Sequence, residues 1–524
     1  MTAFLFLFVK IKLLLLHMVK KYYIIIKYSY LLEALMTDTE RRDLLNEIQK
    51  RINGGFCQVI GAGVSNVPLV RWLCKRRADV TVRDGKPFAR LDSARELTML
   101  GAKLICGAEY LESLAELPHP TRTVIFRSPG VRPDLPAIQA AVDAGAILTS
   151  EMELFLLMTP AKVIAITGSD GKTTTTTLTG MIAKAASGKR VFVGGNIGKP
   201  LLPEVENMTD NDIAVIELSS FQLQTMTHSC DTAVITNITE NHLNWHHGME
   251  EYTLAKYNVF QNGGCRRLII NFDNELTVRA GEVAISLDVP PSLTFFSLTA
   301  DSYAKSVPSY AKGIATALFV REGSVVLSDG TTETEILKTD DIKIAGRHNV
   351  ANYMTAIGAC LDELSDFECV REIAKDFGGV PHRLEFVREH NGVKYYNSSI
   401  DSTPTRTAAA LSALKEKPIT ICCGADKGTS FVPLAEALCA RAKAVVLTGA
   451  SKDKILAALN DYDGYSTDAL PTYVCPDFLS AVEMARDVAV EGDTVLLSPS
   501  CTSFDAFNNF EERGDTFKKI VNSF

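Results

Sequence analysis

Short apolar runs rich in valine, isoleucine and leucine recur along the chain from about residue 57 to residue 497. Runs of this kind are typical of strands that are buried on both faces of a parallel sheet. Helical segments separate them, so the pattern predicts an α/β fold. The expected strands are 57–60, 80–83, one ending at 105, 125–126, 163–166, 213–217, 233–236, 268–270, 419–422, 444–447 and 494–497.

The length of 524 residues predicts about three domains. We expect a Rossmann-like N-terminal domain at 50–150 and a central P-loop ATPase-like domain with a parallel sheet at 151–380. A second Rossmann-like α/β domain is expected at 381–524. In such sheets ligands bind beyond the carboxyl ends of the strands, so the loops that follow the strands are the places to look for a site.

Residues 1–35 stand apart from this pattern. The stretch 2–19 reads AFLFLFVKIKLLLLHMVK, and Lys10 and Lys12 interrupt it, so we expect no stable membrane insertion. No small-residue cleavage site follows the apolar run, as a signal peptide would require. We interpret residues 1–35 as a non-native extension from a start codon assigned too early, with translation beginning at Met36.

Composition narrows the function classes. The formal net charge of −8 argues against a general nucleic-acid-binding surface. The twelve cysteines show no paired zinc spacing and no regular framework, which favours reduced thiols and a cytoplasmic location.

The most informative motif is TGSDGKTT at 167–174, directly after the apolar run 163–166. Glycines let backbone N–H groups approach phosphate oxygens, and a helix N-terminus favours negative charge. Lys172 is expected to reach the terminal phosphates and Thr173 to hold Mg²⁺, which predicts ATP or GTP as a ligand. The motif is shorter than the usual phosphate loop, because Ile166 stands where the first glycine is normally found.

A second glycine turn, Gly61-Ala62-Gly63, follows the first strand, and Asp84 ends the next one. This spacing is typical of a dinucleotide fold in which a carboxylate binds a ribose hydroxyl. The third glycine of that pattern is absent. A Rossmann-like domain that holds a nucleotide other than NAD is therefore the favoured interpretation.

Three further groups are candidates for chemistry. Glu217 closes an apolar strand, where a carboxylate is well placed for Mg²⁺. Three histidines lie within 242–247 and raise the alternative of zinc, although no cysteine or acidic partner completes such a set. Lys256 is four residues after Tyr252 on one helix face, and burial would lower its pKa enough for it to react.

Several ordered motifs together resemble the Mur ligases of peptidoglycan synthesis, from about residue 50 to the end of the chain. Within that family, ELSSFQL and the C-terminal stretch LSPSCTSFDAFNNFEERG resemble the members that add D-glutamate. The motifs are TGSDGKTT at 167–174, ELSSFQL at 217–223, NHLNWH at 241–246, GRHNVAN at 346–352, PHRLE at 381–385 and the stretch 497–514.

The resemblance implies an ATP-dependent ligase that joins D-glutamate to UDP-N-acetylmuramoyl-L-alanine during cytoplasmic peptidoglycan synthesis, and so a role in cell shape and cell division. ATP would phosphorylate the L-alanine carboxylate, and the amine of D-glutamate would attack the acyl phosphate. The implied cofactors are ATP, two Mg²⁺ ions and a CO₂-derived carbamate on Lys256. We expect a monomer.

The resemblance also implies roles around the nucleotide. Lys172, Glu217, His242 and Lys256 would be catalytic. Thr173 and Glu217 would hold one Mg²⁺, and His242 and the carbamate on Lys256 the other. The implied ATP-binding residues are Gly168, Ser169, Asp170, Gly171, Lys172, Thr173, Thr174, Asn349, Asn352 and Arg383.

On the substrate side the resemblance implies two groups. The UDP substrate would contact Val64, Ser65, Asn66, Asp84, Ser128, Gly130 and Asn196. D-Glutamate would contact Ser402, Lys427, Ser503, Phe504 and Phe510. Three positions depart from the family pattern: Ile400 replaces a lysine that some members carry, Asp401 adds a negative charge beside an anionic substrate, and Asn244 replaces a frequent aspartate.

Alternatives remain open at this point. Another Mur-type ligase, adding L-alanine or a diamino acid, or a folylpolyglutamate-type ligase would share the central motifs, and the segment 504–514 argues against them. A regulatory nucleotide switch would not need Glu217, His242 and Lys256 together. An NAD-dependent oxidoreductase rests on Gly61-Ala62-Gly63 alone.

Overall fold

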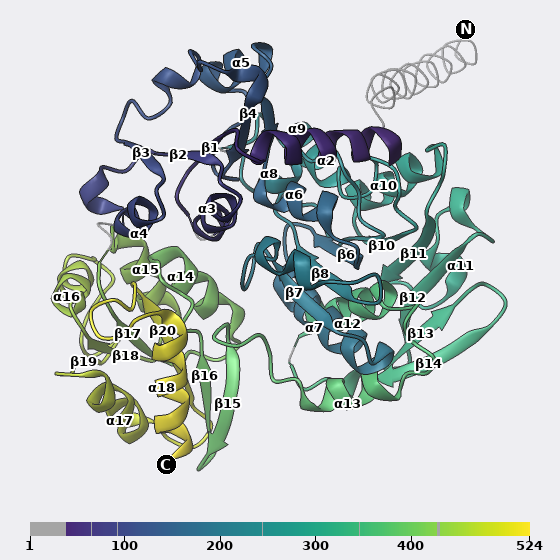
Figure 1. The fold of residues 1–524 in the computed structure, drawn as a ribbon. Coiled ribbons are helices and arrows are strands. Elements are labelled where there is room, and N and C mark those ends of the chain that lie inside the picture. Colours follow the sequence, from purple (N-terminus) through teal and green to yellow (C-terminus); the bar gives the residue numbers. More distant parts are fainter. Residues whose placement is uncertain (1–37, 64, 92, 244, 345, 427–429) are drawn as a thin grey trace, which may run out of the picture. The chain divides into compact units, whose positions relative to one another are not determined.

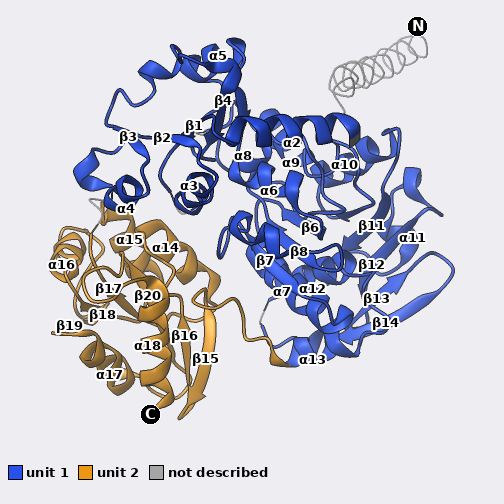
Figure 2. Cartoon of the chain, in the orientation of Figure 1, with its two compact units in different colours: residues 1–375 blue, residues 376–524 orange. Residues whose placement is uncertain are grey.

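The computed structural model describes residues 38–63, 65–91, 93–243, 245–344, 346–426 and 430–524. The chain divides into two compact units, Met1–Lys375 and Asp376–Phe524 (Figure 2). The described part contains three sheets, and helices alternate with most of their strands along the chain (Figure 1). The predicted α/β class with parallel sheets is confirmed.

The first sheet has the strand order β3-β2-β1-β4-β5, and all its pairings are parallel. The order reverses between β1 and β4, so the loops after these strands open at a switch point where ligands bind in such folds. The strands are β1 Phe56–Ile60, β2 Asp79–Asp84, β3 Lys103–Cys106, β4 Thr123–Arg127 and β5 Ile147–Thr149. The helices of this region are α2 Asp38–Ile52, α3 Asn66–Lys75, α4 Ala94–Met99 and α5 Pro136–Asp143.

The second sheet has the order β14-β13-β12-β11-β10-β9-β6-β8-β7, parallel except for the β12–β13–β14 hairpins. Its strands are β6 Lys162–Thr167, β7 Val191–Gly195, β8 Ile213–Glu217, β9 Thr232–Ile235, β10 Arg267–Asn271, β11 Ser292–Ser297, β12 Ala315–Arg321, β13 Ser324–Ser328 and β14 Glu333–Lys338. The helices are α6 Glu151–Met158, α7 Lys172–Ser187, α8 Ser220–Leu223, α9 Met249–Tyr257, α10 Glu275–Ile285, α11 Tyr303–Ser306, α12 Arg347–Ala359 and α13 Glu368–Asp376.

The third sheet has the order β15-β16-β20-β17-β18-β19, with only the β15–β16 pair antiparallel. Its strands are β15 Glu385–His390, β16 Val393–Asn397, β17 Ile419–Cys423, β18 Ala444–Thr448, β19 Thr472–Val474 and β20 Thr494–Ser500. The helices are α14 Pro404–Ala413, α15 Val432–Arg441, α16 Lys452–Asn460, α17 Phe478–Val488 and α18 Phe510–Asn522.

One continuous cluster of buried apolar side chains joins the first two sheets. It includes Val59 and Phe126 from the first sheet, Phe155 from α6, and Ala165 and Ile216 from the second sheet. Burial of this much apolar surface stabilises the packing of the two sheets, so residues up to 375 form one unit. The domain borders predicted at 150 and 380 stay a prediction.

Among the helices that the structure describes, none combines the length and the apolar character needed to cross a bilayer. The predicted extension 1–35 lies outside the described residues.

Candidate active site

The phosphate loop joins β6 to α7, as the motif predicts. Gly168 has a φ of +147° and Gly171 one of +77°, which side chains rarely allow. A Cβ atom on Gly168 would also lie 1.9 Å from Thr236 Oγ1, so no larger residue fits there. The positive end of the α7 dipole therefore lies at a turn whose backbone can approach an anion closely.

Neighbouring elements hold this loop in place. Lys172 Nζ donates to the carbonyl oxygens of Gly168, at 3.0 Å, and Ser169, at 2.8 Å. The Ser169 and Tyr252 hydroxyls are 2.8 Å apart, which ties the loop to α9. The Asp170 backbone N–H donates to Asn237 Oδ1 at 3.0 Å, so the turn after β9 supports the same loop.

Glu217 ends β8, and its backbone pairs with Ile166 of β6, so the carboxylate comes out beside the phosphate loop. Its side chain accepts a hydrogen bond from Thr173 Oγ1 at 2.8 Å and one from Asn196 Nδ2 at 2.9 Å. Three predicted site residues from separate segments thus meet at one point. A hydroxyl and a carboxylate side by side are the oxygen ligands that Mg²⁺ prefers.

Lys256 lies on α9 with only 1% of its surface exposed. Its Nζ donates to the Gly168 carbonyl at 2.7 Å and lies 4.7 Å from the centre of the Tyr252 ring. Burial, together with the positive charge of Lys172, lowers the pKa of Lys256 well below that of an ordinary lysine. This shift favours the neutral, nucleophilic form of the amine within the phosphate site.

His242 lies in the loop between β9 and α9, with a φ of +56°. Partial burial, and then the charges of Lys172 and Lys256, lower its pKa. These charges act on it because all three side chains surround the same site. The other two histidines have different partners: His246 contacts Ser220 and Glu251, and His247 contacts Asp134.

Two predicted ATP-binding residues, Asn349 and Asn352, lie on α12, which packs beside α7 (Figure 1). Asn352 Nδ2 donates to Asn349 Oδ1 at 3.0 Å, and Asn352 Oδ1 accepts from Thr175 of α7 at 3.2 Å. Both asparagines thus share a helix that contacts the helix of the phosphate loop. Arg383 belongs to the second unit, and its predicted contact with ATP stays a prediction.

The first sheet brings most of the predicted UDP-substrate residues to one edge. Asp84 accepts hydrogen bonds from the Ala62 N–H at 2.9 Å and the Lys86 N–H at 2.8 Å. Asn66, in α3, donates to the Gly61 carbonyl at 2.8 Å, so it braces the glycine turn. Ser65 immediately precedes α3 and Ser128 immediately follows β4. Val64 lies outside the described residues.

In the second unit, the surroundings of Asp401 explain why an acidic residue is tolerated at this position. Its side chain is 6% exposed and accepts from Ser498 Oγ at 2.8 Å, so it faces β20 in the interior. Burial raises the pKa of Asp401 against the hydrogen bonds from Ser398 and Ser498. The added acid is therefore a buried structural group. Arg406 donates to the carbonyl oxygen of Ile400 at 3.1 Å, which places a cation beside the position where some relatives carry lysine.

The remaining D-glutamate candidates differ in exposure. Ser402 is half-buried, Ser503 is buried, and Phe504 is 72% exposed. Phe510 opens α18, with its ring 5.8 Å from that of His382. Lys427 and the departing position Asn244 lie outside the described residues.

Two supporting residues were not predicted from the sequence. Asn237 holds the phosphate loop, but an asparagine after a strand carries no distinctive signal. Arg513 is buried and donates to Ser399 Oγ at 3.0 Å and to the Ser399 carbonyl at 2.9 Å. Its place within the motif at 497–514 was the available signal.

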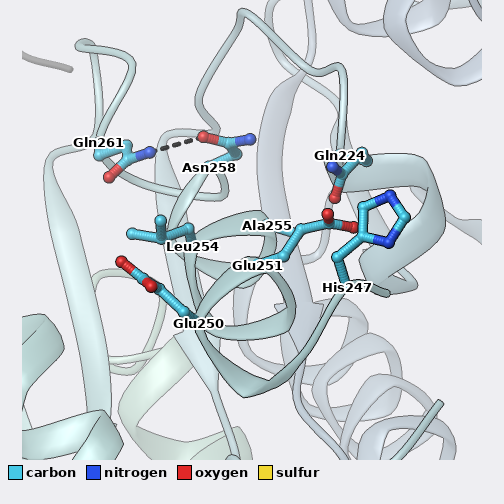
Figure 3. Close-up of a pocket in the computed structure, with 8 residues that line it drawn as sticks. All are labelled: Gln224, His247, Glu250, Glu251, Leu254, Ala255, Asn258 and Gln261. Atoms are coloured by element: carbon cyan, nitrogen blue, oxygen red, sulfur yellow. Dashed lines mark hydrogen bonds between the residues drawn. The ribbon is translucent and has the colours of Figure 1, made fainter. Parts of the chain in front are cut away.

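A hollow of about 350 Å³ lies beside α9 (Figure 3). None of the predicted site residues lines it. Its lining residues are Gln224, His247, Glu250, Glu251, Leu254, Ala255, Asn258 and Gln261.

The sequence is similar to those of known proteins over most of its length. Residues 166–360 match the Mur ligase middle domain, and residues 382–501 match the Mur ligase, glutamate ligase domain. The UDP-N-acetylmuramoylalanine–D-glutamate ligase of Acetivibrio thermocellus is 42% identical, with 91% of this chain and 98% of that protein covered. The enzyme of the same name from Symbiobacterium thermophilum is 42% identical, with 88% and 97% covered.

Among solved structures, UDP-N-acetylmuramate–alanine ligase from Thermotoga maritima gives a TM-score of 0.49 at 17% identity, with 89% of this chain and 99% of that chain covered. The extent and identity of the sequence matches place the chain in a family. It belongs to the Mur ligases and, among them, to the UDP-N-acetylmuramoylalanine–D-glutamate ligases.

Proposed function

We propose that this protein is an ATP-dependent ligase that adds D-glutamate to UDP-N-acetylmuramoyl-L-alanine. The observation that carries the proposal is the 42% identity to a ligase of that name over 91% of this chain. The meeting of Thr173, Glu217 and Lys256 at the phosphate loop supports it, because a degenerate nucleotide switch would not need all three. Other Mur-type or folylpolyglutamate-type ligases are the alternative that the assay below separates.

The chemistry follows from a carboxylate's resistance to attack. Its charge and resonance make it a poor acylating group, so transfer of the γ-phosphoryl group of ATP to the L-alanine carboxylate supplies a leaving group. The amine of D-glutamate then attacks the acyl carbon, phosphate departs, and an amide, ADP and phosphate result. Lys172 and the N-terminus of α7 would neutralise the phosphates while the site aligns the reacting groups.

The residues present fit two Mg²⁺ ions and a carbamate. Thr173 and Glu217 offer adjacent oxygen ligands for one ion, and His242 together with a carbamate on Lys256 would hold the other. Bound Mg²⁺ would offset the negative charge on the transferring phosphoryl group. The lowered pKa of Lys256 favours the neutral amine, which is the form that adds CO₂, whereas an unmodified ammonium would repel a metal.

We further propose that the protein acts as a cytoplasmic monomer in peptidoglycan precursor synthesis, and so supports cell shape and cell division. Reduced cysteines and the nucleotide-linked substrate support this location.

The function is tested by phosphate release from ATP in the presence of UDP-N-acetylmuramoyl-L-alanine, with D-glutamate added or omitted. We expect release only when both substrates are present, and an equal amount of amide product. Equal phosphate release with and without D-glutamate would reject the proposal. Phosphate release that requires L-alanine or a diamino acid instead would favour the alternative ligases.

Replacing Asp84 by alanine is expected to raise KM for the UDP substrate about tenfold or more, with KM for ATP nearly unchanged. A hydrogen bond to a charged group contributes about 1.5–3 kcal/mol, and Asp84 lies on the first sheet, away from the phosphate loop. Steady-state kinetics in both substrates measure the effect. Asp79→Ala, at the other end of β2, is the matched control, and an equal rise in both KM values would mean that the first sheet is wrongly assigned.

A further inference from the structure

His246 lies where the elements of the proposed active site converge, although no motif assigned it a role. Its side chain has no exposed surface. Four aromatic and polar neighbours surround it: Phe221, Trp245, Tyr252 and Ser220. The His246 cluster, defined as these residues with Glu251 and Arg132, connects three separate parts of the first unit.

The hydrogen bonds of the ring determine its tautomer. Nδ1 lies 3.1 Å from Glu251 Oε1, and Nε2 lies 2.9 Å from Ser220 Oγ. Burial raises the pKa of Glu251, but the hydrogen bonds from Arg132 and His246 outweigh this effect and lower the pKa below its ordinary value. The ionised carboxylate can only accept hydrogen bonds. The proton must therefore be on Nδ1, and the Ser220 hydroxyl donates to the free lone pair of Nε2.

On one side the cluster reaches the proposed metal and phosphate groups. Ser220 is the first residue of α8, three positions after Glu217. The rings of Tyr252 and His246 form a T-shaped pair with their centres 5.2 Å apart. The Tyr252 hydroxyl bonds the Ser169 hydroxyl of the phosphate loop, and the Tyr252 ring lies against Lys256. Loss of the His246 ring would free both the turn that carries Glu217 and the ring that supports Lys256.

On the other side the cluster reaches the loop after β4, where Ser128 and Gly130 lie. Arg132 Nη1 donates to Glu251 Oε1 at 3.1 Å and also to the Trp245 carbonyl. The Trp245 indole N–H donates to the Gly130 carbonyl at 3.1 Å. Glu251 extends from α9 at the edge of the hollow in Figure 3.

We propose that His246 is a positioning residue for the acyl-transfer reaction. Through Ser220, Tyr252 and Glu251 it aligns the loop after β4, which is predicted to contact the UDP substrate, with Glu217 and Lys256. This inference rests on the proposed function. Residues that orient metal-holding groups from behind typically contribute ten- to hundredfold to metal affinity or activity. His246 therefore acts through its neighbours and not on the reacting atoms.

The test uses His246→Phe, which keeps an aromatic ring and removes both hydrogen bonds. At saturating Mg²⁺ we expect kcat to fall about ten- to hundredfold and KM for the UDP substrate to rise, while KM for ATP changes less than about twofold. His246→Gln, which can place an amide oxygen near the position of Nε2, should recover part of kcat. His247→Phe, the exposed neighbour, is the matched control and should retain wild-type kinetics.

A double-mutant cycle separates positioning from general stability. If His246 acts through the Ser220 hydroxyl, the Ser220→Ala/His246→Phe double variant should be no slower than His246→Phe alone. Additive losses, or a wild-type kcat in folded His246→Phe, would overturn the inference. Ser220→Ala removes one hydroxyl only and provides the measurement if the histidine variants do not fold.

A binding measurement that does not depend on ligation tests the role of His246 separately from the proposed function. Calorimetric titration of Mg²⁺ and a non-hydrolysable ATP analogue should show about tenfold weaker Mg²⁺ binding in His246→Phe. Unchanged binding would overturn the inference even if the wild-type protein ligates D-glutamate. Weakened binding in a protein that does not ligate D-glutamate would reject only the substrate assignment.

Discussion

Replacing Lys256 by alanine is expected to lower kcat by about a thousandfold or more. The side chain is buried against the Gly168 carbonyl within the phosphate site, so a carbamate on it would supply the negative group that holds the second Mg²⁺. Its loss removes several kcal/mol of charge stabilisation, and each 1.36 kcal/mol is tenfold in rate. Phosphate release with both substrates measures the change.

Chemical rescue makes this prediction specific. Added formate or acetate should restore part of the activity of Lys256→Ala, because a free carboxylate can occupy the space and carry the charge of the carbamate. Lys184→Ala, which changes an exposed lysine on α7, is the control. It should retain wild-type activity, and added formate or acetate should not change its rate. Full activity in the unrescued Lys256→Ala protein would refute the role of this residue in metal binding.

The second large effect is expected for Glu217→Gln, with kcat lower by about a hundredfold or more. The substitution keeps the shape of a side chain that is 2% exposed and removes only its charge. A charge aimed at a bound cation in a buried site contributes far more than it would in water. The Mg²⁺ concentration for half-maximal activity should rise together with the fall in kcat.

A magnesium titration at saturating ATP separates this effect from simple unfolding. Excess Mg²⁺ should recover part of the lost rate, and the melting temperature should stay close to that of the wild type. Glu204→Gln changes an exposed carboxylate of the same region and should leave the magnesium dependence as it is. An unchanged magnesium dependence in Glu217→Gln would remove this carboxylate from the proposed metal site.

Local sequence order determined much of this protein. The run 163–166 followed by glycines and Lys172 predicts a strand, a turn and a helix, because chain connectivity alone brings these parts together. Parallel strands end at the same edge of a sheet, so Glu217 was expected beside the loop as well. The motifs that resemble the Mur ligases correctly predicted the family.

Tertiary structure decided what depends on contacts between distant segments. Spacing placed Lys256 beside Tyr252, but only packing against β6 shows that the amine is buried and its pKa lowered. Asp401 was unexplained until the fold turned it toward Ser498. His246 looked like one of three loop histidines, and only long-range packing made it the centre of a hydrogen-bonded cluster.

The physical reason is the range of the interactions. Backbone torsions, glycine turns and helix starts are set by neighbours along the chain, and a sequence displays those neighbours directly. Burial and the direction of a polar side chain depend on partners that folding brings from far away, as Glu251 and Ser220 come to His246. The sequence by itself therefore determined the strand-and-helix order and the chemistry available, and the tertiary structure decided which of those groups act together.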